Sequence, residues 1–437
     1  MIEAPATPAS RLLEAWKDLD PEDRLQQFES LPRDQADDFF LELASRDQWE
    51  LLREMPEGER RIWLRLLPPD DAADVIQLSE EDERPQLLDQ LDPMARSEVT
   101  ALLAYKEDEA GGLMSPRFAR LRPDMTVDEA ISYLRRQAGQ LETIYYAYAL
   151  DDAQRLLGVV SFRGLFSADR NRPVRDVMHT QFVAATEDMD QEAVAKLVTA
   201  NHLLAVPVLD AAGRMQGIVT VDDIVDVVQE EASEDIQKVG GMEALDAPYL
   251  EIGFWRMVRK RAGWLAVLFL GEMLTATAMG YFEHEIARAV VLALFVPLII
   301  SSGGNSGSQA TTLVIRAMAV GEVRLRDWWK IVRREFSTGL VLGSVLAIIG
   351  ITRILLWQAI WQPYGQHYFV VGLTVAFSLI GVVLFGTVAG SMLPFILRRL
   401  GLDPASASAP FVATLVDVTG LVIYFTVASV IMRGTLL

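Results

Sequence analysis

The fold of this chain is decided by Ser408-Ala-Pro-Phe-Val-Ala-Thr-Leu-Val-Asp417-Val-Thr-Gly420-Leu-Val-Ile-Tyr-Phe-Thr-Val-Ala-Ser-Val-Ile-Met432, a membrane-length apolar run with one carboxylate in its middle. A lone carboxylate at bilayer depth costs on the order of a few kcal/mol unless it faces water or a partner. Another apolar run is interrupted by Ser301-Ser-Gly303-Gly304-Asn305-Ser-Gly307-Ser-Gln309. Irregular, glycine-rich backbone is tolerated at this depth only where it is buried in protein or lines a cavity. Together the two stretches predict a path for cations.

Five apolar segments are long enough to cross a membrane, which takes about 20 residues. We place them near 262–282, 289–315, 336–361, 367–397 and 408–432. Basic residues gather before the first span, between the second and third, and between the fourth and fifth: Arg256, Arg259, Lys260, Arg261, Arg316, Arg324, Arg326, Lys330, Arg333, Arg334, Arg398 and Arg399. Because Lys and Arg mark cytoplasmic loops, we expect residues 1–260 in the cytoplasm and the C-terminus outside.

The charge is distributed unevenly along the chain. Residues 1–250 carry 25 of the 40 basic and 51 of the 60 acidic side chains, a net charge of −26 against +6 for the rest. An acidic surface attracts cations and repels nucleic acid, so nucleic acid is not expected as a partner. The absence of cysteine excludes disulfides and thiolate metal sites, which leaves oxygen ligands for any metal.

No enzymatic activity is expected. The chain has only four His, and no Ser/His/Asp or Cys/His constellation or phosphate-binding loop before a lysine is recognisable. Its first residues, Met1-Ile-Glu-Ala-Pro, do not resemble a cleavable signal peptide. We therefore expect the acidic part to stay on the side of the membrane where it is made.

Two kinds of repeat organise the acidic part. Leu31-Pro-Arg-Asp34 resembles Leu67-Pro-Pro-Asp70, and Pro followed by Asp is typical of a helix start. Residues 11–110 therefore predict a stack of helical hairpins. A second repeat has a period near 60, in which Gly158-Val-Val-Ser161 is echoed by Gly217-Ile-Val-Thr220. Each of its units reads as helix, strand, turn, strand and closing helix.

This second repeat resembles a tandem pair of CBS domains, an α/β regulatory module that binds adenosine nucleotides or senses ions. In that family a Gly-x-x-Thr/Ser-x-x-Asp run contacts ribose and phosphate. Gly217-Ile-Val-Thr220-Val-Asp222-Asp223 matches the run, whereas Gly158-Val-Val-Ser161-Phe-Arg-Gly164 lacks the final Asp. The resemblance implies at most one adenosine site, formed by Thr220 and Asp223, with ATP as the candidate ligand. The alternative is that Asp223 only caps a helix.

Three motifs in fixed order extend the likeness to the whole chain: Pro297 to Gln309, Pro394-Phe-Ile-Leu-Arg-Arg-Leu-Gly401-Leu-Asp-Pro404, and Pro410 to Gly420. They resemble the MgtE family of magnesium channels. The resemblance implies a multidomain chain with an α-helical N-terminal superhelix (1–110), an α/β tandem CBS pair (111–236, divided near 173/174), a linking or plug helix (237–261) and an all-α five-helix transmembrane domain (262–437). It also implies an inner-membrane homodimer with a pore lined by the second and fifth spans, and closure when cytosolic Mg²⁺ binds between the acidic domains and the linking helix.

The residues of the membrane part agree with such a pore. Mg²⁺ dehydrates reluctantly and keeps several waters, so few direct ligands are needed. Asp417 would supply charge, while freed backbone carbonyls and an amide would contact the water shell. The expected pore residues are Asp417, Asn305, Gly303, Gly304, Ala413 and Glu272.

Some alternatives for these residues stay open. The glycine cluster could serve only for close helix packing. Asp417 could pair with Arg353, the one basic residue inside a neighbouring span, although Arg353 could also extend its charge to the membrane surface. Glu272, inside the first span, could line the ion path or bond to a neighbouring helix.

Carboxylates are concentrated where the CBS pair leads to the membrane. On a helix, Asp222, Asp226 and Glu230 fall four residues apart and form one stripe. Like charges on one helix face destabilise it unless cations lie between them, so acidic domains would separate at low Mg²⁺ and be bridged at high Mg²⁺. The sensor candidates are Asp222, Asp226, Glu230, Glu234, Asp246, Glu251, Asp89 and Asp92. The alternative is an ordinary solvated acidic face.

The sequence thus predicts a Mg²⁺-selective channel for uptake across the inner membrane, closed by cytosolic Mg²⁺, with Mg²⁺, the lipid bilayer and a second copy of the chain as partners. One alternative is a transporter of other divalent cations such as Mn²⁺ or Co²⁺, because hard oxygen ligands suit several ions. The other is a membrane-anchored CBS nucleotide sensor, which would have no use for Asp417.

Overall fold

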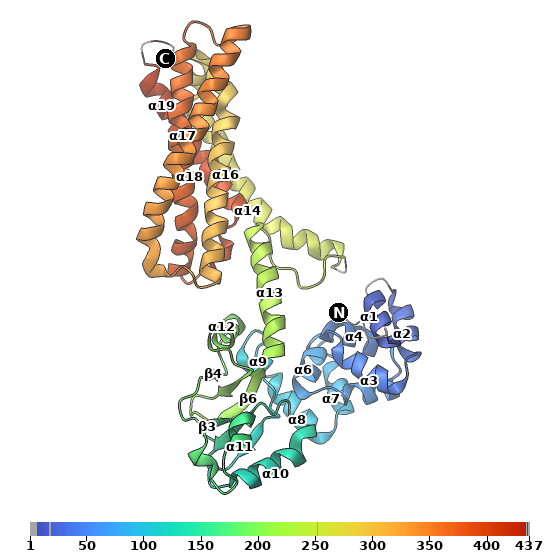
Figure 1. Cartoon of the computed structure of the whole chain (residues 1–437). Coiled ribbons are helices and arrows are strands. Elements are labelled where there is room, and N and C mark those ends of the chain that lie inside the picture. The colour runs from blue at the N-terminus through green and yellow to red at the C-terminus, as the bar shows by residue number, and fades with distance from the viewer. Residues whose placement is uncertain (1–6, 17–18, 251, 434, 436–437) are drawn as a thin grey trace. The chain divides into compact units, whose positions relative to one another are not determined.

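The computed structural model describes residues 7–16, 19–250, 252–433 and 435. The chain divides into two compact units, Met1–Gln229 and Glu230–Leu437 (Figure 1). The first unit contains short helices followed by two small sheets, and the second contains five helices long and apolar enough to cross a membrane. The expected fold class of a helical, an α/β and an all-helical membrane part is confirmed. The limits of the four expected domains stay predictions.

Short helices form the N-terminal part of the first unit. They are α1 (Pro8–Ala15), α2 (Pro21–Glu29), α3 (Arg33–Glu42), α4 (Ser45–Glu54), α5 (Glu57–Leu64), α6 (Pro69–Gln77), α7 (Arg84–Gln90), α8 (Pro93–Leu102) and α9 (Ala110–Leu113). Helices two apart in the chain pack together, α2 on α4, α4 on α6 and α6 on α8. This alternation is what a stack of helical hairpins requires, and Phe28, Phe40 and Trp63 fill its centre with rings in mutual contact.

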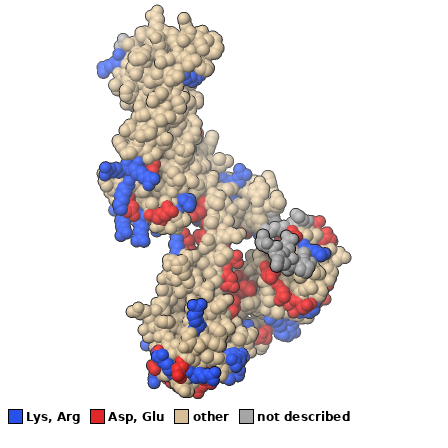
Figure 2. Space-filling view, viewed as in Figure 1, with Lys and Arg blue, Asp and Glu red and all other residues tan. Residues whose placement is uncertain are grey.

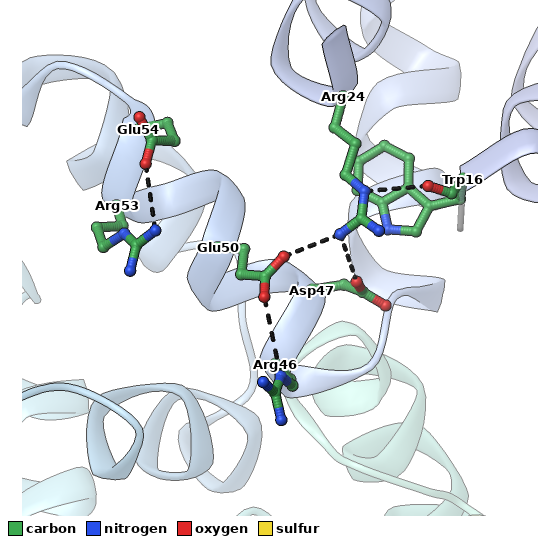
Figure 3. Close-up of polar contacts among 7 residues, drawn as sticks. All are labelled: Trp16, Arg24, Arg46, Asp47, Glu50, Arg53 and Glu54. Carbon is green, nitrogen blue, oxygen red and sulfur yellow. Dashed lines mark hydrogen bonds and ion pairs between the residues drawn. The ribbon is translucent and has the colours of Figure 1, made fainter. Parts of the chain in front are cut away.

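A nearly buried arginine ties two of these hairpins together. Arg24 of α2 donates from Nε to the Trp16 carbonyl at 3.0 Å and from Nη1 to Glu50 Oε2 of α4 at 2.8 Å (Figure 3). The same Nη1 lies 3.4 Å from Asp47 Oδ1. Because the Arg24 side chain is only 10% exposed and its two carboxylate partners are mostly covered, solvent screens these contacts much less than a surface pair.

The two repeats form matching α/β units. The first consists of β1 (Ala119–Leu121), α10 (Val127–Gln137), the 3₁₀ turn η2 (Ala138–Gln140), β2 (Tyr146–Leu150), β3 (Leu156–Ser161) and α11 (Phe162–Ser167). The second, after η3 (Val174–Asp176), consists of β4 (Ala185–Thr186), α12 (Gln191–Asn201), β5 (Ala205–Leu209), β6 (Met215–Thr220) and α13 (Val221–Val239). In each sheet the middle strand pairs parallel to the first and antiparallel to the third. The predicted order of helix, strand, strand and closing helix is confirmed, and each unit has in addition a leading strand, β1 or β4, that was not predicted.

The repeats exchange their leading segments, which explains why Met and Gly recur in both. Met114, at the start of the first repeat, lies against Gly217 of the second, and Met178 lies against Gly158 of the first. A Cβ atom on either glycine would come within 2.8 Å of the methionine Cγ. The glycines are therefore required for this packing of one repeat on the other.

The second unit is a bundle of long helices. After α13 come α14 (Phe254–Tyr281), α15 (Glu283–Arg288), η4 (Val290–Phe295), α16 (Val296–Ala319), η5 (Leu325–Asp327), α17 (Trp328–Trp361), α18 (Tyr368–Arg399), η6 (Pro404–Ser406) and α19 (Ala409–Ile431). α18 packs against α16, α17 and α19, while α14 packs mainly on α19. Figure 2 shows most Lys and Arg of this bundle at one end, together with Asp and Glu, and a few at the other, with a broad belt of uncharged surface between them, the pattern expected of membrane helices.

The glycine-rich stretch of the second span does not interrupt its helix. α16 runs without a break from Val296 to Ala319, so the expected freed carbonyls at Gly303 and Gly304 are wrong, as they are at Ala413 within the unbroken α19. The reason is close packing. A Cβ on Gly386 of α18 would lie 2.4 Å from the Gly303 carbonyl oxygen, so the two backbones touch.

The expected single linking helix over 237–261 is also corrected. α13 ends at Val239, an irregular stretch follows, and the basic segment after Gly253 forms the first turns of α14, which continues into the membrane span. Glycines cause the break: Gly240 follows the helix end, and Gly241 has a left-handed backbone with φ +75°.

Loss of the buried arginine should weaken the helical stack. Arg24→Met keeps the side-chain stem but leaves Asp47 and Glu50 without their cation. We expect the first thermal unfolding step of the full chain to lose about 2–3 kcal/mol, below the range for fully buried pairs because the carboxylates retain some solvent. Arg53→Met is the control, since the exposed Arg53 side chain pairs with its neighbour Glu54 (Figure 3). Equal effects of the two variants would contradict this role for Arg24.

Candidate ion pathway and regulatory carboxylates

The Asp417 carboxylate lies over a glycine of the neighbouring helix. Asp417 projects from the middle of α19, and a Cβ built on Gly304 of α16 would be 3.8 Å from its Oδ1 and 3.5 Å from Ala413 Cα. Three of the predicted pore residues are thereby brought together. Gly304 leaves the carboxylate room that a side chain would fill.

Glu272 adds a second carboxylate at the same level. It lies on α14 beside Asp417, near enough for electrostatic and hydrogen-bond interaction. The two helices approach closely there, since a Cβ on Gly271 would be 2.8 Å from Thr414 Cγ2. Two carboxylates side by side within apolar spans require water, a proton or a cation between them.

Asn305 lies on an exposed polar face of α16. Ser301, Asn305 and Gln309 follow one another at intervals of four residues, and all are exposed. Such side chains are costly against hydrocarbon, so this face needs water or another protein surface. Gly303, in contrast, turns toward Val382 and Val416 and is buried. The structure thus groups Asn305 with the polar face and gives Gly303 a packing role.

Arg353 does not pair with Asp417 in this structure. Its Nη1 donates to the Tyr364 hydroxyl at 2.9 Å, and its guanidinium lies 5.0 Å from the centre of the Trp357 ring. Tyr364 belongs to the connection between α17 and α18. Arg353 is therefore held near the end of α17, which leaves the Asp417 carboxylate without this cation.

The first unit contains a group of carboxylates that the sequence analysis did not assemble. It consists of Asp70, Asp71, Glu142, Asp222, Asp223 and Asp226, called here the carboxylate cluster. These residues come from the start of α6, the segment before β2 and the start of α13. Ser115 Oγ lies between two of them, 3.1 Å from Glu142 Oε2 and 3.4 Å from Asp70 Oδ1.

Four of these carboxylates, Asp70, Asp71, Glu142 and Asp223, have pKa values raised chiefly by burial. Burial, and then the charges of neighbouring cluster members, raise the pKa of Asp71 to about 6. Burial raises the pKa of Asp223 to about 7, and the pKa values of Asp70 and Glu142 also lie above their usual ranges, chiefly because of burial. A cation placed among them would relieve this repulsion.

The adenosine-site candidates Thr220 and Asp223 contact each other. Asp223 Oδ2 accepts hydrogen bonds from Thr220 Oγ1 at 2.7 Å and from the Thr220 backbone N–H at 3.2 Å. α13 begins at Val221, so Thr220 is the residue just before the helix and Asp223 is its third residue. Their hydrogen bonds are those of a cap residue with the third residue of its helix. Asp223 is thus not the N-cap itself, as the alternative had it, but contributes to capping α13 from its third position.

The remaining sensor candidates are spread over both units. Asp222 and Asp226 belong to the carboxylate cluster and are exposed on α13, as is Glu230 one helical turn further on. Glu234 pairs with Lys238, Asp246 with Arg256 and Asp89 with Arg96. Asp92 caps α8, and hydrogen bonds from the Ala95 and Met94 backbone lower its pKa. Glu251 lies outside the described residues.

The structure holds these groups without a preassembled metal site. Among the residues described, no three His, Cys, Asp or Glu side chains are arranged to hold a metal ion. A hydrated Mg²⁺ does not need such a set, because it keeps several of its waters and uses one or two carboxylates. The carboxylate cluster and the Asp417–Glu272 pair both fit that mode of binding. For the cluster residues outside α13, the one signal in the sequence was the pair Asp70-Asp71 at the start of a helix.

Comparisons with known families account for most of the chain. Residues 296–427 match the MgtE family, described as a divalent cation transporter, and residues 7–108 match the MgtE intracellular N domain. Residues 110–171 and 174–230 each match the CBS domain.

Individual relatives cover nearly the full length. The chain is 41% identical to the magnesium transporter MgtE of Thermus thermophilus over 97% of its own length and 93% of the relative. It is 30% identical to the magnesium transporter MgtE of Bacillus subtilis over 95% of its length and 90% of that protein. Among solved structures, the cytosolic domain of the Mg²⁺ channel MgtE in complex with ATP is 41% identical, with a TM-score of 0.48 over 50% of this chain and 90% of that one.

The raised pKa values predict that the first unit loses stability as pH rises. Asp71 and Asp223 keep their protons in the folded chain at pH values where the unfolded chain has lost them. Their contribution to the free energy of unfolding is therefore full below about pH 4. It then declines as pH rises through about 6 to 7, where the two groups ionise. We expect the first thermal transition of the full chain to fall between pH 5 and 8, and Mg²⁺ to raise it more at pH 8. Asp71→Asn with Asp223→Asn should flatten the pH profile, and an unchanged profile would contradict this origin.

Proposed function

The chain belongs to the MgtE family, and on that premise we propose that it is a Mg²⁺-selective channel for magnesium uptake, closed from the cytoplasm by Mg²⁺ itself. The observation that carries the proposal is the Asp417 carboxylate at membrane depth, set over Gly304 and beside Glu272. Such an arrangement is costly in an apolar span unless it serves a hydrated cation.

The pore is formed between two copies of the chain. The exposed polar face of α16 (Ser301, Asn305, Gln309) and the half-buried Asp417 of α19 need a water-filled neighbour, and a two-fold axis beside them would supply one. Repeating Asp417 and Glu272 across this axis places four carboxylates around the ion. Their negative charge favours a divalent cation, while the waters kept by Mg²⁺ bond to Asn305 and the carboxylates.

The protein spans the inner membrane with the acidic unit in the cytoplasm. The basic residues Arg324 before α17, Arg334 near the start of α17 and Arg399 at the end of α18 mark the cytoplasmic side. An odd number of spans, five among the residues described, then puts the C-terminus outside. The apolar side chains exposed on α14, such as Leu265, Phe269 and Leu274, face lipid or the second copy.

Closure by Mg²⁺ follows from the carboxylate cluster. At low cytosolic Mg²⁺ its members repel one another and loosen the contact between α6 and α13. At high Mg²⁺ a hydrated ion neutralises Asp71, Asp222 and Asp226 and holds the two helices together. α13 carries this change toward the membrane, because it is a single helix from Val221 to Val239.

An adenosine nucleotide is a second ligand of the same unit. The second CBS repeat has the Thr220 and Asp223 pair that the family uses for ribose and phosphate, and the first repeat lacks it. Binding would require Thr220 and Asp223 to exchange their mutual hydrogen bond for bonds to the nucleotide. One nucleotide per chain is therefore expected.

Removing the pore carboxylate should stop transport. For Asp417→Asn in liposomes we expect Mg²⁺ flux to fall at least about tenfold, since each hydrogen bond to a charged group contributes about 1.5–3 kcal/mol. Glu272→Gln should reduce flux less, because Glu272 is more exposed. Glu335→Gln, a carboxylate on α17, is the control and should leave flux unchanged. Normal Mg²⁺ flux through Asp417→Asn would refute the pore assignment.

Neutralising the α13 stripe should weaken closure without closing the pore. We expect Asp222→Asn with Asp226→Asn to conduct normally at low Mg²⁺ and to need several-fold more cytoplasmic Mg²⁺ for closure. Glu81→Gln with Asp82→Asn removes the same charge from an exposed turn before α7 and should close as the parent does. If both double variants close at the parent's Mg²⁺ concentration, the sensor lies outside this stripe.

A further inference from the structure

The end of α13 is fastened to the loop that leads into α19. Lys238, in the last turn of α13, donates from Nζ to Asp403 Oδ2 at 2.7 Å and also pairs with Glu234 one turn earlier. The other oxygen of Asp403 accepts from the Ala405 backbone N–H at 2.8 Å and so caps the turn η6. One carboxylate therefore joins the α13 cation to the backbone of the α18–α19 loop.

Apolar packing supports the same contact. Val239, the residue after Lys238, packs on a small buried cluster formed by Ile315 of α16 with Ala405 and Ala407 of the loop. Ala405 and Ala407 are almost fully buried. The last turn of α13 thus contacts the loop through both its charge and its apolar side.

The chain that follows α13 reaches the first turn of α19. Gly241 has φ +75°, and a Cβ there would lie 3.0 Å from the Trp264 ring and 3.2 Å from Pro410 Cγ. The Trp264 indole N–H donates to Ser408 Oγ at 3.1 Å, and Ser408 is the buried N-cap of α19. Only a glycine fits between these groups.

Lys238, Val239, Gly241, Asp403 and Ser408 are called here the α13–α19 joint. α13 begins in the carboxylate cluster and ends in this joint, and α19 leads from the joint to Asp417, about 13 Å further on at 1.5 Å per residue. We propose that Lys238 is the positioning residue that couples α13 to the pore helix, by holding its end on Asp403 so that the two move together. This inference rests on the proposed function and specifies how closure would reach the ion site.

The charge of Lys238 is secure at all physiological pH values. Burial by itself would lower its pKa, but hydrogen bonds and charges from Asp403 and Glu234 more than compensate, and the pKa of Lys238 lies above its usual value. Lys238 therefore keeps its positive charge in the joint. Its function is transmission, while sensing belongs to the carboxylates at the other end of α13.

The test compares Mg²⁺ flux into liposomes for the full-length parent, Lys238→Met, Lys238→Arg and Asp403→Asn at graded cytoplasmic Mg²⁺. Asp403→Asn keeps an oxygen that can cap η6 and loses the charge that binds Lys238. We expect Lys238→Met and Asp403→Asn to conduct like the parent at low Mg²⁺ but to close only at roughly two- to fivefold higher Mg²⁺, the scale of one half-exposed ion pair. Lys238→Arg should close as the parent does.

A matched control comes from the neighbouring loop. Lys330, in the first turn of α17, pairs with Asp327 of η5 at 2.8 Å, so Lys330→Met removes the same charge from the same side of the bundle. It should leave closure unchanged. If Lys330→Met raised the Mg²⁺ concentration needed for closure as much as Lys238→Met does, the effect would be one of charge in general. That result would overturn the role of Lys238.

Because the chain has no cysteine, a covalent rescue is possible. Lys238→Cys with Asp403→Cys should need more Mg²⁺ for closure, and bridging the two thiols with a short bifunctional reagent should restore the parent's response. A parent without Mg²⁺-dependent flux would refute the proposed function itself. Two results would overturn only the coupling. One is a Lys238→Met variant that closes at the same Mg²⁺ concentration as a normally closing parent, and the other is a bridged double variant whose response to Mg²⁺ is not restored.

Discussion

The rest of the membrane structure depends on the contact between the backbones of α16 and α18. Gly303 and Gly307 of α16 meet Gly386 and Gly390 of α18, each pair spaced four residues apart, so that one ridge without side chains lies on another. Thr311 then donates to the Gly390 carbonyl at 2.7 Å. In lipid, where burying apolar surface gains little, such close approach is a main source of helix association. It allows α19 to pack on both helices, which sets Asp417 over Gly304.

In the first unit, burial and then mutual repulsion disfavour the charged form of Asp71, a member of the carboxylate cluster. The carboxylate cluster is drawn together by the packing of the helical stack on the second repeat, whose apolar side chains form one continuous core. That core overcomes the electrostatic cost, and the cost appears in the raised pKa values of Asp71 and Asp223. Carboxylates that are difficult to ionise in the folded chain are stabilised strongly by a bound cation, because the cation favours their charged form. α13 runs as one uninterrupted helix from the cluster residues Asp222 and Asp226 to Lys238 of the α13–α19 joint, which is the connection that the proposed closure requires.

Local patterns predicted much of the fold correctly, for reasons particular to each element. The five spans follow from apolar length, and the CBS repeats follow from the recurring Met and Gly that pack on each other. The glycine-rich stretch was misjudged because glycine both permits irregular backbone and permits close packing, and only a neighbouring helix decides between them. The linking helix was misplaced because Gly240 and Gly241 end α13, while the basic residues after them continue into α14.

By itself the sequence determined the membrane spans, the acidic and basic parts, the repeats and the position of Asp417 inside an apolar span, because each depends on residues near one another in the chain. Only the tertiary structure decided which carboxylates share a site. Asp70, Asp71 and Glu142 join Asp222 across three separate segments, Glu272 reaches Asp417 from another helix, and Lys238 meets Asp403 from a distant loop. Electrostatic interactions depend on distance in space, and the packing of helices sets that distance whatever the separation along the chain.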